Sequence, residues 1–206
     1  TPENIPNFSA VLYHFGKNIQ QDQQIPIGLI NSSWGGSPIE PWTVTSKSSG
    51  KMYNGMIAPI IQFPVTGTIW YQGETNVINK NGLAYYDKKK DLIEGWRNAF
   101  QNKDMPFYFV QIAPWGNARY ATGELPALWE AQCATLKLPH TGMAVTTDLV
   151  SNLKDIHPRN KHDVGDRLSR WALAKHYGKK NLVYSGPLYK AMKTEGKSIR
   201  ISFAHA

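Results

Sequence analysis

The sequence predicts an α/β protein in which a parallel β-sheet is covered by helices on both faces. Short apolar segments, typical of strands buried on both sides, alternate with longer segments whose apolar residues recur every three or four positions, typical of helices. The connections between successive apolar segments are long enough for the crossover helices that parallel strands need. With 206 residues, 41% of them hydrophobic, the chain can bury the core of one domain, or two at most.

The first third of the chain predicts a helix, a strand, a short helix and a second strand. Apolar residues at helical spacing form one stripe near the N-terminus: Phe8, Val11, Leu12, Phe15 and Ile19. The nearly all-apolar residues 25–30 predict the first buried strand, which the turn-like sequence SSWGGS follows. After an irregular stretch, residues 54–61 predict a short helix and residues 66–71 a second buried strand.

The rest of the chain repeats this alternation. Residues 83–100 predict a helix interrupted by Gly95, residues 107–112 a third strand, and residues 125–136 a helix. Residues 143–147 predict a fourth strand, and residues 161–177 a helix with Gly178 as its C-terminal cap.

The C-terminal tail has β character at residues 182–184 and 198–203. We therefore expect two units. Residues 1–187 form the main α/β domain, and residues 188–206 are a β-type tail that leads toward a further β element.

Composition excludes several classes of function. The net charge is +8, but the densest basic cluster, residues 88–90, lies between Asp87 and Asp91 and predicts a solvated helix face, so we expect no nucleic-acid partner. No apolar run approaches the roughly 20 residues of a membrane span, so no membrane partner is expected. Cys133 is the only cysteine, which excludes an internal disulfide framework and a cysteine-based metal site. We expect no metal and no cofactor.

The strongest local signal for chemistry is the sequence Asp155-Ile156-His157-Pro158, in a loop after a strand and before a helix. A histidine fixed there can act as a general base, because its pKa lies near neutral pH and a nearby carboxylate can orient it and stabilise the imidazolium. The alternative is a capping or surface histidine.

Two polar, glycine-rich segments also follow predicted strands. The backbone N–H groups of Gly35 and Gly36 can point at an oxyanion, since glycine lets the main chain approach closely. The side-chain amides of Gln72 and Asn76 can add donors. The alternatives are an ordinary turn and a polar loop with local hydrogen bonds.

Three longer blocks contain these residues: IPIGLINSSWGGSPIEPW at 25–42, GTIWYQGETN at 67–76, and DIHPRNKHDVGDRLSRWALAKHYG at 155–178. In this order they resemble the sialate O-acetylesterase family, within the SGNH hydrolase superfamily, over about residues 7–187. The resemblance implies a three-layer, flavodoxin-like SGNH fold, an acetylated sugar as substrate, and a secreted, periplasmic or lysosomal location.

The resemblance also implies roles for individual residues. His157 is the general base of a Ser-His mechanism, and Gly36 or Gly35 supplies an oxyanion-hole N–H. Gln72 is the first choice for a side-chain donor and Asn76 the second. The substrate-binding residues are expected to be Trp34, Glu74 and Arg159.

The chain departs from the superfamily pattern in two ways. The nucleophile is expected in a Gly-(Asp or Gln)-Ser motif before the first block, and this sequence has no such motif, so we expect the serine and the N-terminal strand to lie outside it and this fragment alone to be inactive. The superfamily's acid lies three residues before the histidine, where this chain has Lys154; Asp155, Asp148 or a backbone carbonyl can serve instead. Ser32 and Ser33 lack the sharp Gly-x-Ser-x-Gly turn that exposes a nucleophile.

The cluster of aromatic residues near the strand ends can stack on a sugar or pack the core: Trp34, Trp42, Trp70, Tyr71 and Trp115. Arg159 and Lys161 can face an acidic sugar or solvate a helix start. We expect an esterase that removes O-acetyl groups from sialic acid. The alternatives are an acetyl-xylan or other polysaccharide deacetylase, and a non-catalytic carbohydrate-binding remnant.

Overall fold

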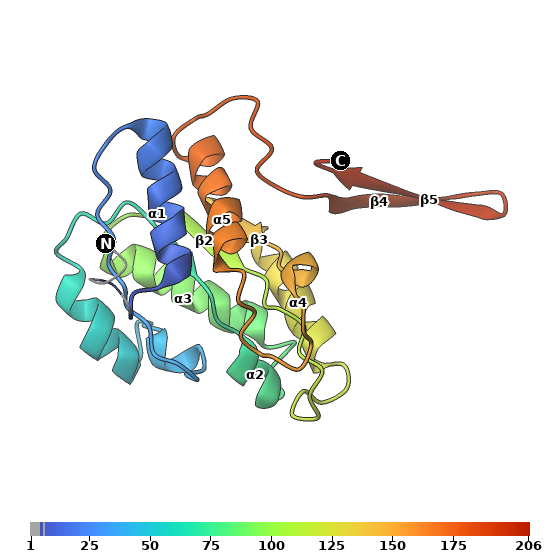
Figure 1. Cartoon of the computed structure of the whole chain (residues 1–206). Coiled ribbons are helices and arrows are strands. Elements are labelled where there is room, and N and C mark those ends of the chain that lie inside the picture. The colour runs from blue at the N-terminus through green and yellow to red at the C-terminus, as the bar shows by residue number, and fades with distance from the viewer. Residues whose placement is uncertain (1–4, 6) are drawn as a thin grey trace.

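The computed structural model describes residue 5 and residues 7–206, and it is built in three layers (Figure 1). The middle layer is a parallel sheet in the order β1 (Thr68–Trp70), β2 (Phe107–Val110) and β3 (Thr141–Ala144). Ile69 is paired with Tyr108, and Tyr108 with Gly142. The prediction of a parallel α/β sheet with helices on both faces is confirmed.

Each face of the sheet carries its own hydrophobic core. Helices α1 (Ala10–Gln23) and α5 (Lys161–Lys175) pack together on one face, while α3 (Tyr85–Ala99) and α4 (Glu124–Thr135) pack on the other. Alternate residues of β2 point into the two cores. Phe107 and Phe109 enter the α3–α4 core, whereas Tyr108 and Val110 enter the α1–α5 core. All four are buried, which explains the unbroken apolar run.

Short elements connect these layers: η2 (Glu40–Trp42), η3 (Tyr53–Ile57), η4 (Ala58–Ile60), α2 (Glu74–Ile78) and η5 (Thr147–Leu149). The helix expected at residues 54–61 is a π-helical turn, η3, followed by the 3₁₀ turn η4. Pro59 lies within η4, and because proline lacks a backbone N–H it cannot continue an α-helical ladder.

The strand predicted at residues 25–30 is wrong. This segment runs without regular secondary structure and pairs with none of the described strands. Ile25 and Ile30 are 44% and 49% exposed. A strand exists only through backbone hydrogen bonds to a neighbour, and an apolar pattern does not reveal whether that neighbour is present. The fourth strand is also displaced, since β3 ends at Ala144 rather than at residue 147.

The solvated face predicted for residues 88–90 is wrong for Lys89. This side chain is fully buried in α3, with its Nζ 3.2 Å from the centroid of the Phe109 ring. Burial holds the pKa of the Lys89 amine well below its ordinary value. Lys89 lies one helical turn after the buried Tyr85 and one turn before Ile93, so helical spacing puts it on the apolar side of α3.

Gly95 does not interrupt α3. The helix runs through it, and a Cβ at this position would lie 2.0 Å from the carbonyl oxygen of Val44. The neighbouring Trp96 donates its indole N–H to the carbonyl of Trp42 at 2.8 Å. The glycine therefore permits close packing of the loop onto the helix.

The C-terminal tail forms an antiparallel hairpin of β4 (Leu188–Glu195) and β5 (Ser198–Ala204), which projects from the body (Figure 1). Residues 182–184 are not a strand and belong to the connection before it. Helix α5 ends at Lys175, and Gly178 follows with a φ of +71°. The chain reverses there, so the N–H of Lys179 donates to the carbonyl of Leu173 at 2.8 Å.

Replacing Gly142 with alanine is expected to destabilise the protein. A Cβ on Gly142 would lie 2.5 Å from the Trp171 indole, which is buried between α5 and β3 and donates to the carbonyl of Met143 at 2.9 Å. We expect a loss of about 1–3 kcal/mol in the free energy of unfolding, as for other overpacked cores. Urea unfolding of Gly142→Ala measures it, with Gly186→Ala as control because a Cβ there meets nothing within 4 Å. Equal midpoints for the two variants would contradict this packing argument.

Candidate active site

A cleft of about 1510 Å³ opens at the carboxyl end of β1, the side of a parallel sheet where ligands bind. The cleft brings together residues from all three sequence blocks. Its lining includes Trp34, Gly35, Gly36, Gln72, Glu74 and His157. Asp155, Asn76 and Arg159, which the sequence also suggested, do not line it.

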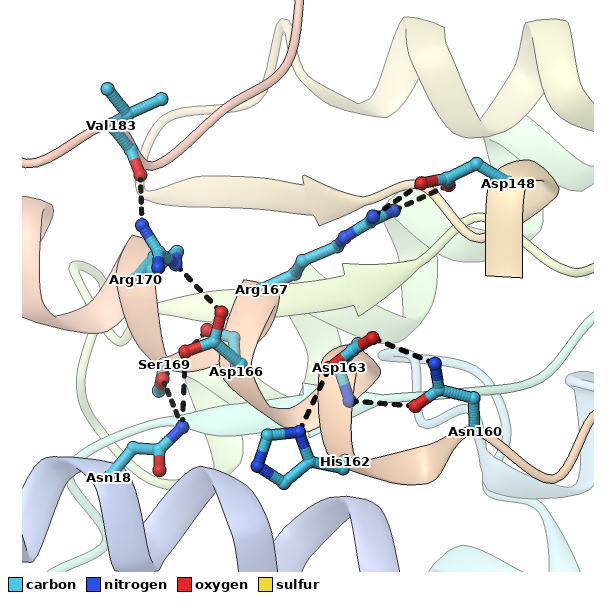
Figure 2. Close-up of polar contacts among 10 residues, drawn as sticks. All are labelled: Asn18, Asp148, Asn160, His162, Asp163, Asp166, Arg167, Ser169, Arg170 and Val183. Atoms are coloured by element: carbon cyan, nitrogen blue, oxygen red, sulfur yellow. Dashed lines mark hydrogen bonds and ion pairs between the residues drawn. The ribbon is translucent and has the colours of Figure 1, made fainter.

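The loop that carries His157 is fastened at both ends (Figure 2). At its start, Arg167 of α5 donates to both carboxylate oxygens of Asp148, at 2.7 and 2.6 Å. At its end, the side chain of Asn160 caps α5 by accepting from the N–H of Asp163 at 3.1 Å, and it donates to that residue's carboxylate at 2.8 Å. The two ends of the loop are therefore held against the same helix.

The middle of this loop rests on a second loop that the sequence analysis did not connect with it. The indole N–H of Trp115 donates to the carbonyl of Lys154 at 3.2 Å, and the N–H of Gly116 donates to the carbonyl of Leu153 at 2.8 Å. Trp115 in turn packs edge-on against Tyr120, with ring centroids 5.1 Å apart. The loop after β2 therefore positions the loop of His157.

Neither predicted acid contacts the His157 ring. The carboxylate of Asp155 accepts a hydrogen bond from the backbone N–H of His157 at 2.8 Å, so it fixes the main chain instead. Asp148 is occupied by Arg167, whose hydrogen bonds lower the pKa of that carboxyl group. The identity of the supporting acid stays a prediction.

Glu74 is an acidic side chain that lines the cleft together with His157. It is half-buried at the start of α2, and burial raises the pKa of its carboxyl group against the opposing charges of Lys161 and His157. The Nζ atom of Lys161 lies 4.9 Å from the centroid of the Tyr71 ring. Burial lowers the pKa of the Lys161 amine, and the negative charge of Glu74 offsets part of this effect. The charges of Lys161 and Glu74 thus oppose each other's loss of solvation at the wall of the cleft.

Gly35 and Gly36 are suited to bind an oxyanion. Gly36 has a φ of +72°, which glycine adopts at no cost, and a Cβ on either residue would meet nothing within 4 Å. Among the described residues, neither backbone N–H donates to a protein acceptor. Both donors therefore stay available at the wall of the cleft.

Gln72 is poorly placed as an oxyanion donor. Its Nε2 donates to the carbonyl of Ser37 at 3.2 Å and to Oδ1 of Asn76 at 2.8 Å, while its Oε1 accepts from the hydroxyl of Tyr85 at 2.9 Å. An amide has two N–H donors, and both are used here. Gln72 ties the glycine loop to the end of β1.

Asn76 is a framework residue. It is fully buried, and its Oδ1 also accepts from the N–H of Ile39 at 3.0 Å. Its Nδ2 lies 3.3 Å from each carboxylate oxygen of Glu40. Asn76 therefore fixes the chain before the sheet, and the side-chain donor predicted from the sequence is not found at this residue.

No serine among the described residues is hydrogen-bonded to the His157 ring. The hydroxyl of Ser32 lies 3.4 Å from the carbonyl of Met56, and that of Ser33 3.2 Å from Oδ1 of Asn31. Ser37 donates to the carbonyl of Trp34 at 2.8 Å. The Ser33 and Ser37 hydroxyls bond within their own turn, whereas that of Ser32 bonds to η3.

Aromatic and cationic side chains border the mouth of the cleft. Trp34 is 63% exposed, whereas Trp42 and Trp70 belong to the core. Arg119, which the sequence analysis did not single out, lines the cleft together with Lys161. Within the described part of the chain, neither cation forms an ion pair.

In residues 5 and 7–206, no group of three or more His, Cys, Asp or Glu side chains is arranged to hold a metal ion. The same residues contain no helix with both the length and the apolar character needed to cross a membrane.

Comparison with known proteins is consistent across sequence and structure. Residues 7–174 match the family described as carbohydrate esterase, sialic acid-specific acetylesterase. The human sialate O-acetylesterase is 36% identical over 217 aligned positions, a match that covers 87% of this chain and 41% of that protein. The rat sialate O-acetylesterase is 31% identical, covering 92% and 47%. The chain thus spans less than half the length of these relatives.

Two solved structures are similar. A carbohydrate acetylesterase from Xanthomonas citri superposes with a TM-score of 0.89 at 39% identity, covering 99% of this chain and 49% of its own. A protein from Arabidopsis thaliana has a TM-score of 0.66 at 21% identity, covering 78% of this chain and 66% of its own, and supports the fold.

Removing the Asp148 carboxylate is expected to change how stability depends on pH. Arg167 lowers the folded-state pKa of Asp148, so the pair stabilises the protein above the ordinary Asp pKa of about 3.9 and loses this effect as pH falls through the lower folded-state value. The melting temperature of Asp148→Asn should lie below wild type between about pH 5 and 8, with the gap closing in stronger acid. The gap is small, because surface pairs contribute about 1 kcal/mol or less.

Asp91→Asn is the control for this experiment, since Asp91 is an exposed helical carboxylate with no ion pair among the described residues. A pH-independent gap for Asp148→Asn, or an identical profile for both variants, would show that the Arg167 contact does not stabilise the loop.

Proposed function

This chain belongs to the carbohydrate esterase family of sialic acid-specific acetylesterases, and on that premise we propose that it is the larger part of the catalytic domain of a carbohydrate O-acetylesterase. One observation carries the proposal. His157 and the free N–H groups of Gly35 and Gly36, from two distant blocks of the sequence, line the same cleft.

The reaction is acyl transfer through a serine ester. His157 takes the proton of a serine hydroxyl as that oxygen attacks the acetyl carbonyl, and the Gly35 and Gly36 N–H groups stabilise the oxyanion. His157 then protonates the departing sugar oxygen, which leaves the acetyl group on the serine. In the second half of the reaction His157 takes a proton from water as it attacks this ester and returns the proton to the serine oxygen, so that acetate is released. Asp155 holds the His157 backbone in place during these steps.

The nucleophile is supplied by a segment outside residues 1–206. Support comes from the part of the cleft that lies beside β1, which we call the slot. Side chains of both helical layers line it: Val11, Phe15 and Leu168 from one core, and Trp42, Ile57 and Trp96 from the other. Only a position within the sheet layer touches both cores.

The slot is bordered by a strand edge that is free to pair with a further strand. β1 pairs with β2 alone, so its other edge is unpaired within the described sheet, and residues 25–30 also line the cleft. The cleft volume of about 1510 Å³ exceeds the roughly 300–1,000 Å³ of ordinary ligand sites. We propose that one extended strand pairs in parallel with the free edge of β1 and carries the serine to the cleft that His157 lines.

The substrate is an O-acetylated acidic sugar, as expected for a sialate esterase. Arg119 and Lys161 provide positive charge at the cleft without ion-pair partners among the described residues, and the exposed Trp34 offers a flat surface for a sugar ring. The second candidate, deacetylation of a neutral polysaccharide such as xylan, is favoured by the open position of Trp34 but does not use the two cations.

Replacing His157 with alanine in the full-length protein should lower kcat for hydrolysis of 9-O-acetyl sialic acid by about 10³-fold or more, because the general base is lost. His162→Ala is the matched control, since His162 is an exposed histidine at the start of α5 that does not line the cleft. Acetate release measures both. Turnover that survives His157→Ala would contradict the mechanism, and preference for acetylated xylan would select the second candidate substrate.

The origin of the nucleophile can be tested with a fluorophosphonate, which reacts with activated serines. The full-length protein should be labelled at a serine outside residues 1–206, and the double variant Ser32→Ala, Ser33→Ala should be labelled equally, because those hydroxyls bond to Met56 and Asn31 and not to His157. Mass spectrometry of the modified peptide identifies the site. A label on any serine of this chain would refute the proposal.

A further inference from the structure

A buried tyrosine contacts the residue that holds the loop of Gly35 and Gly36. Tyr85 is the first residue of α3 and is fully buried. Its hydroxyl oxygen lies 2.9 Å from both carbonyl oxygens of Gln72, that of the main chain and Oε1 of the side chain. Gln72 in turn donates to the carbonyl of Ser37, which follows the two glycines. One side chain therefore links the Tyr85 hydroxyl to the glycine loop.

The hydrogen bonds of Tyr85 have a defined direction. The indole N–H of Trp70 lies 3.4 Å from the hydroxyl oxygen and can only donate, so the hydroxyl proton is left for Gln72. Because Oε1 of Gln72 faces this proton, Nε2 of the same amide faces Ser37 and Asn76. Burial raises the pKa of the Tyr85 phenol above its ordinary value of about 10, so the hydroxyl stays a donor at neutral pH.

Asn76 excludes the opposite orientation of the Gln72 amide. Its Nδ2 lies 3.3 Å from each carboxylate oxygen of Glu40, which can only accept, so its Oδ1 is the atom that faces Gln72 at 2.8 Å. A reversed Gln72 amide would bring its own oxygen against this oxygen. The contacts from Glu40 to Tyr85 thus have one consistent set of donors and acceptors.

Two consecutive carbonyls of the glycine loop are held by residues that follow β1. The hydroxyl of Thr75 donates to the carbonyl of Gly36 at 2.9 Å, and Gln72 donates to that of Ser37 at 3.2 Å. Within the described residues, the N–H groups of Gly35 and Gly36 have no protein acceptor, and both glycines line the cleft. An oxyanion site needs this arrangement, because its donors must be fixed before the charge develops.

We propose that Tyr85 is a positioning residue for the oxyanion site: its hydroxyl holds the Gln72 amide, which fixes the Ser37 carbonyl and thereby the loop of Gly35 and Gly36. The inference rests on the proposed function, because it assigns the two glycine N–H groups to the acetyl oxyanion. Tyr85 itself does not line the cleft and acts only through Gln72.

A double-mutant cycle in the full-length protein tests this role. Tyr85→Phe removes only the hydroxyl, and kcat for acetate release from 4-nitrophenyl acetate should fall about tenfold or more, somewhat less than the loss of an oxyanion donor. KM should change by less than about twofold, since the ground state does not use the oxyanion site. Gln72→Met should lower kcat similarly, and adding Tyr85→Phe to it should have no further effect. Effects that multiply, or an unchanged kcat in either single variant, would overturn the proposal.

The pH profile separates positioning from proton transfer. Because the phenol keeps its proton, the ratio of kcat between wild type and Tyr85→Phe should stay constant from about pH 6 to 9. A ratio that follows pH would contradict a positioning role. Tyr53→Phe is the matched control and should leave kcat unchanged, since Tyr53 is a buried tyrosine of the same core that does not line the cleft.

A crystal structure of full-length Tyr85→Phe supplies a readout that does not depend on turnover. Nε2 of Gln72 should lie beyond hydrogen-bond distance of the Ser37 carbonyl, more than about 3.5 Å away. A contact kept at the present 3.2 Å would overturn the proposal even if activity fell. If the wild-type protein releases no acetate, the proposed function fails, and this structure alone decides whether Tyr85 holds the loop. If Tyr85→Phe does not fold, an unchanged kcat in Gln72→Met still overturns the inference.

Discussion

The structure depends on burying both faces of β2. Because Phe107 and Phe109 enter one core while Tyr108 and Val110 enter the other, the sheet must be sandwiched between two helical layers. Parallel strands in such a sandwich all end at the same edge. The loops after β1, β2 and β3 therefore meet there, and the cleft is a consequence of how one strand is packed.

Polar contacts then fix those loops with little help from regular secondary structure. Arg167 binds the start of the His157 loop to α5, and the loop after β2 supports its middle through Trp115. Gln72, which follows β1, likewise fixes the glycine loop, because its amide donates to the carbonyl of Ser37 and to the side chain of Asn76. The two side-chain amides are thus used within the framework of the cleft, next to the unbonded N–H groups of Gly35 and Gly36.

The fold was predictable from sequence because periodicity reports burial, and burial on both faces defines a parallel sheet. The failures share one cause, which is that a pattern along the chain does not describe neighbours in space. Residues 25–30 have the composition of a strand, but no neighbouring strand pairs with them. Gly95 suggests a break in the helix from sequence alone, whereas in the structure it allows the backbone of Val44 to pack closely against α3. Lys89 is the exception. Its helical spacing from Tyr85 places it on the buried side of α3, but its positive charge led to the prediction of a solvated position.

For the site, the sequence predicted loops that the structure brings to one cleft, and the catalytic roles of His157, Gly35 and Gly36 stay predictions. Hydrogen bonds decide which polar groups are free, and those bonds can be read only from coordinates. Arg119 had no signal, because an isolated arginine in an irregular loop is indistinguishable from a solvated one.

The slot beside β1 links catalysis to folding. His157, Gly35 and Gly36 line the cleft that contains it. Under the proposed function the nucleophile enters with the strand that fills the slot, so a chain without that strand holds an incomplete set of reactive groups. If the proposed nucleophile enters in this way, pairing of that strand and assembly of the reactive groups become the same step in the folding of the protein.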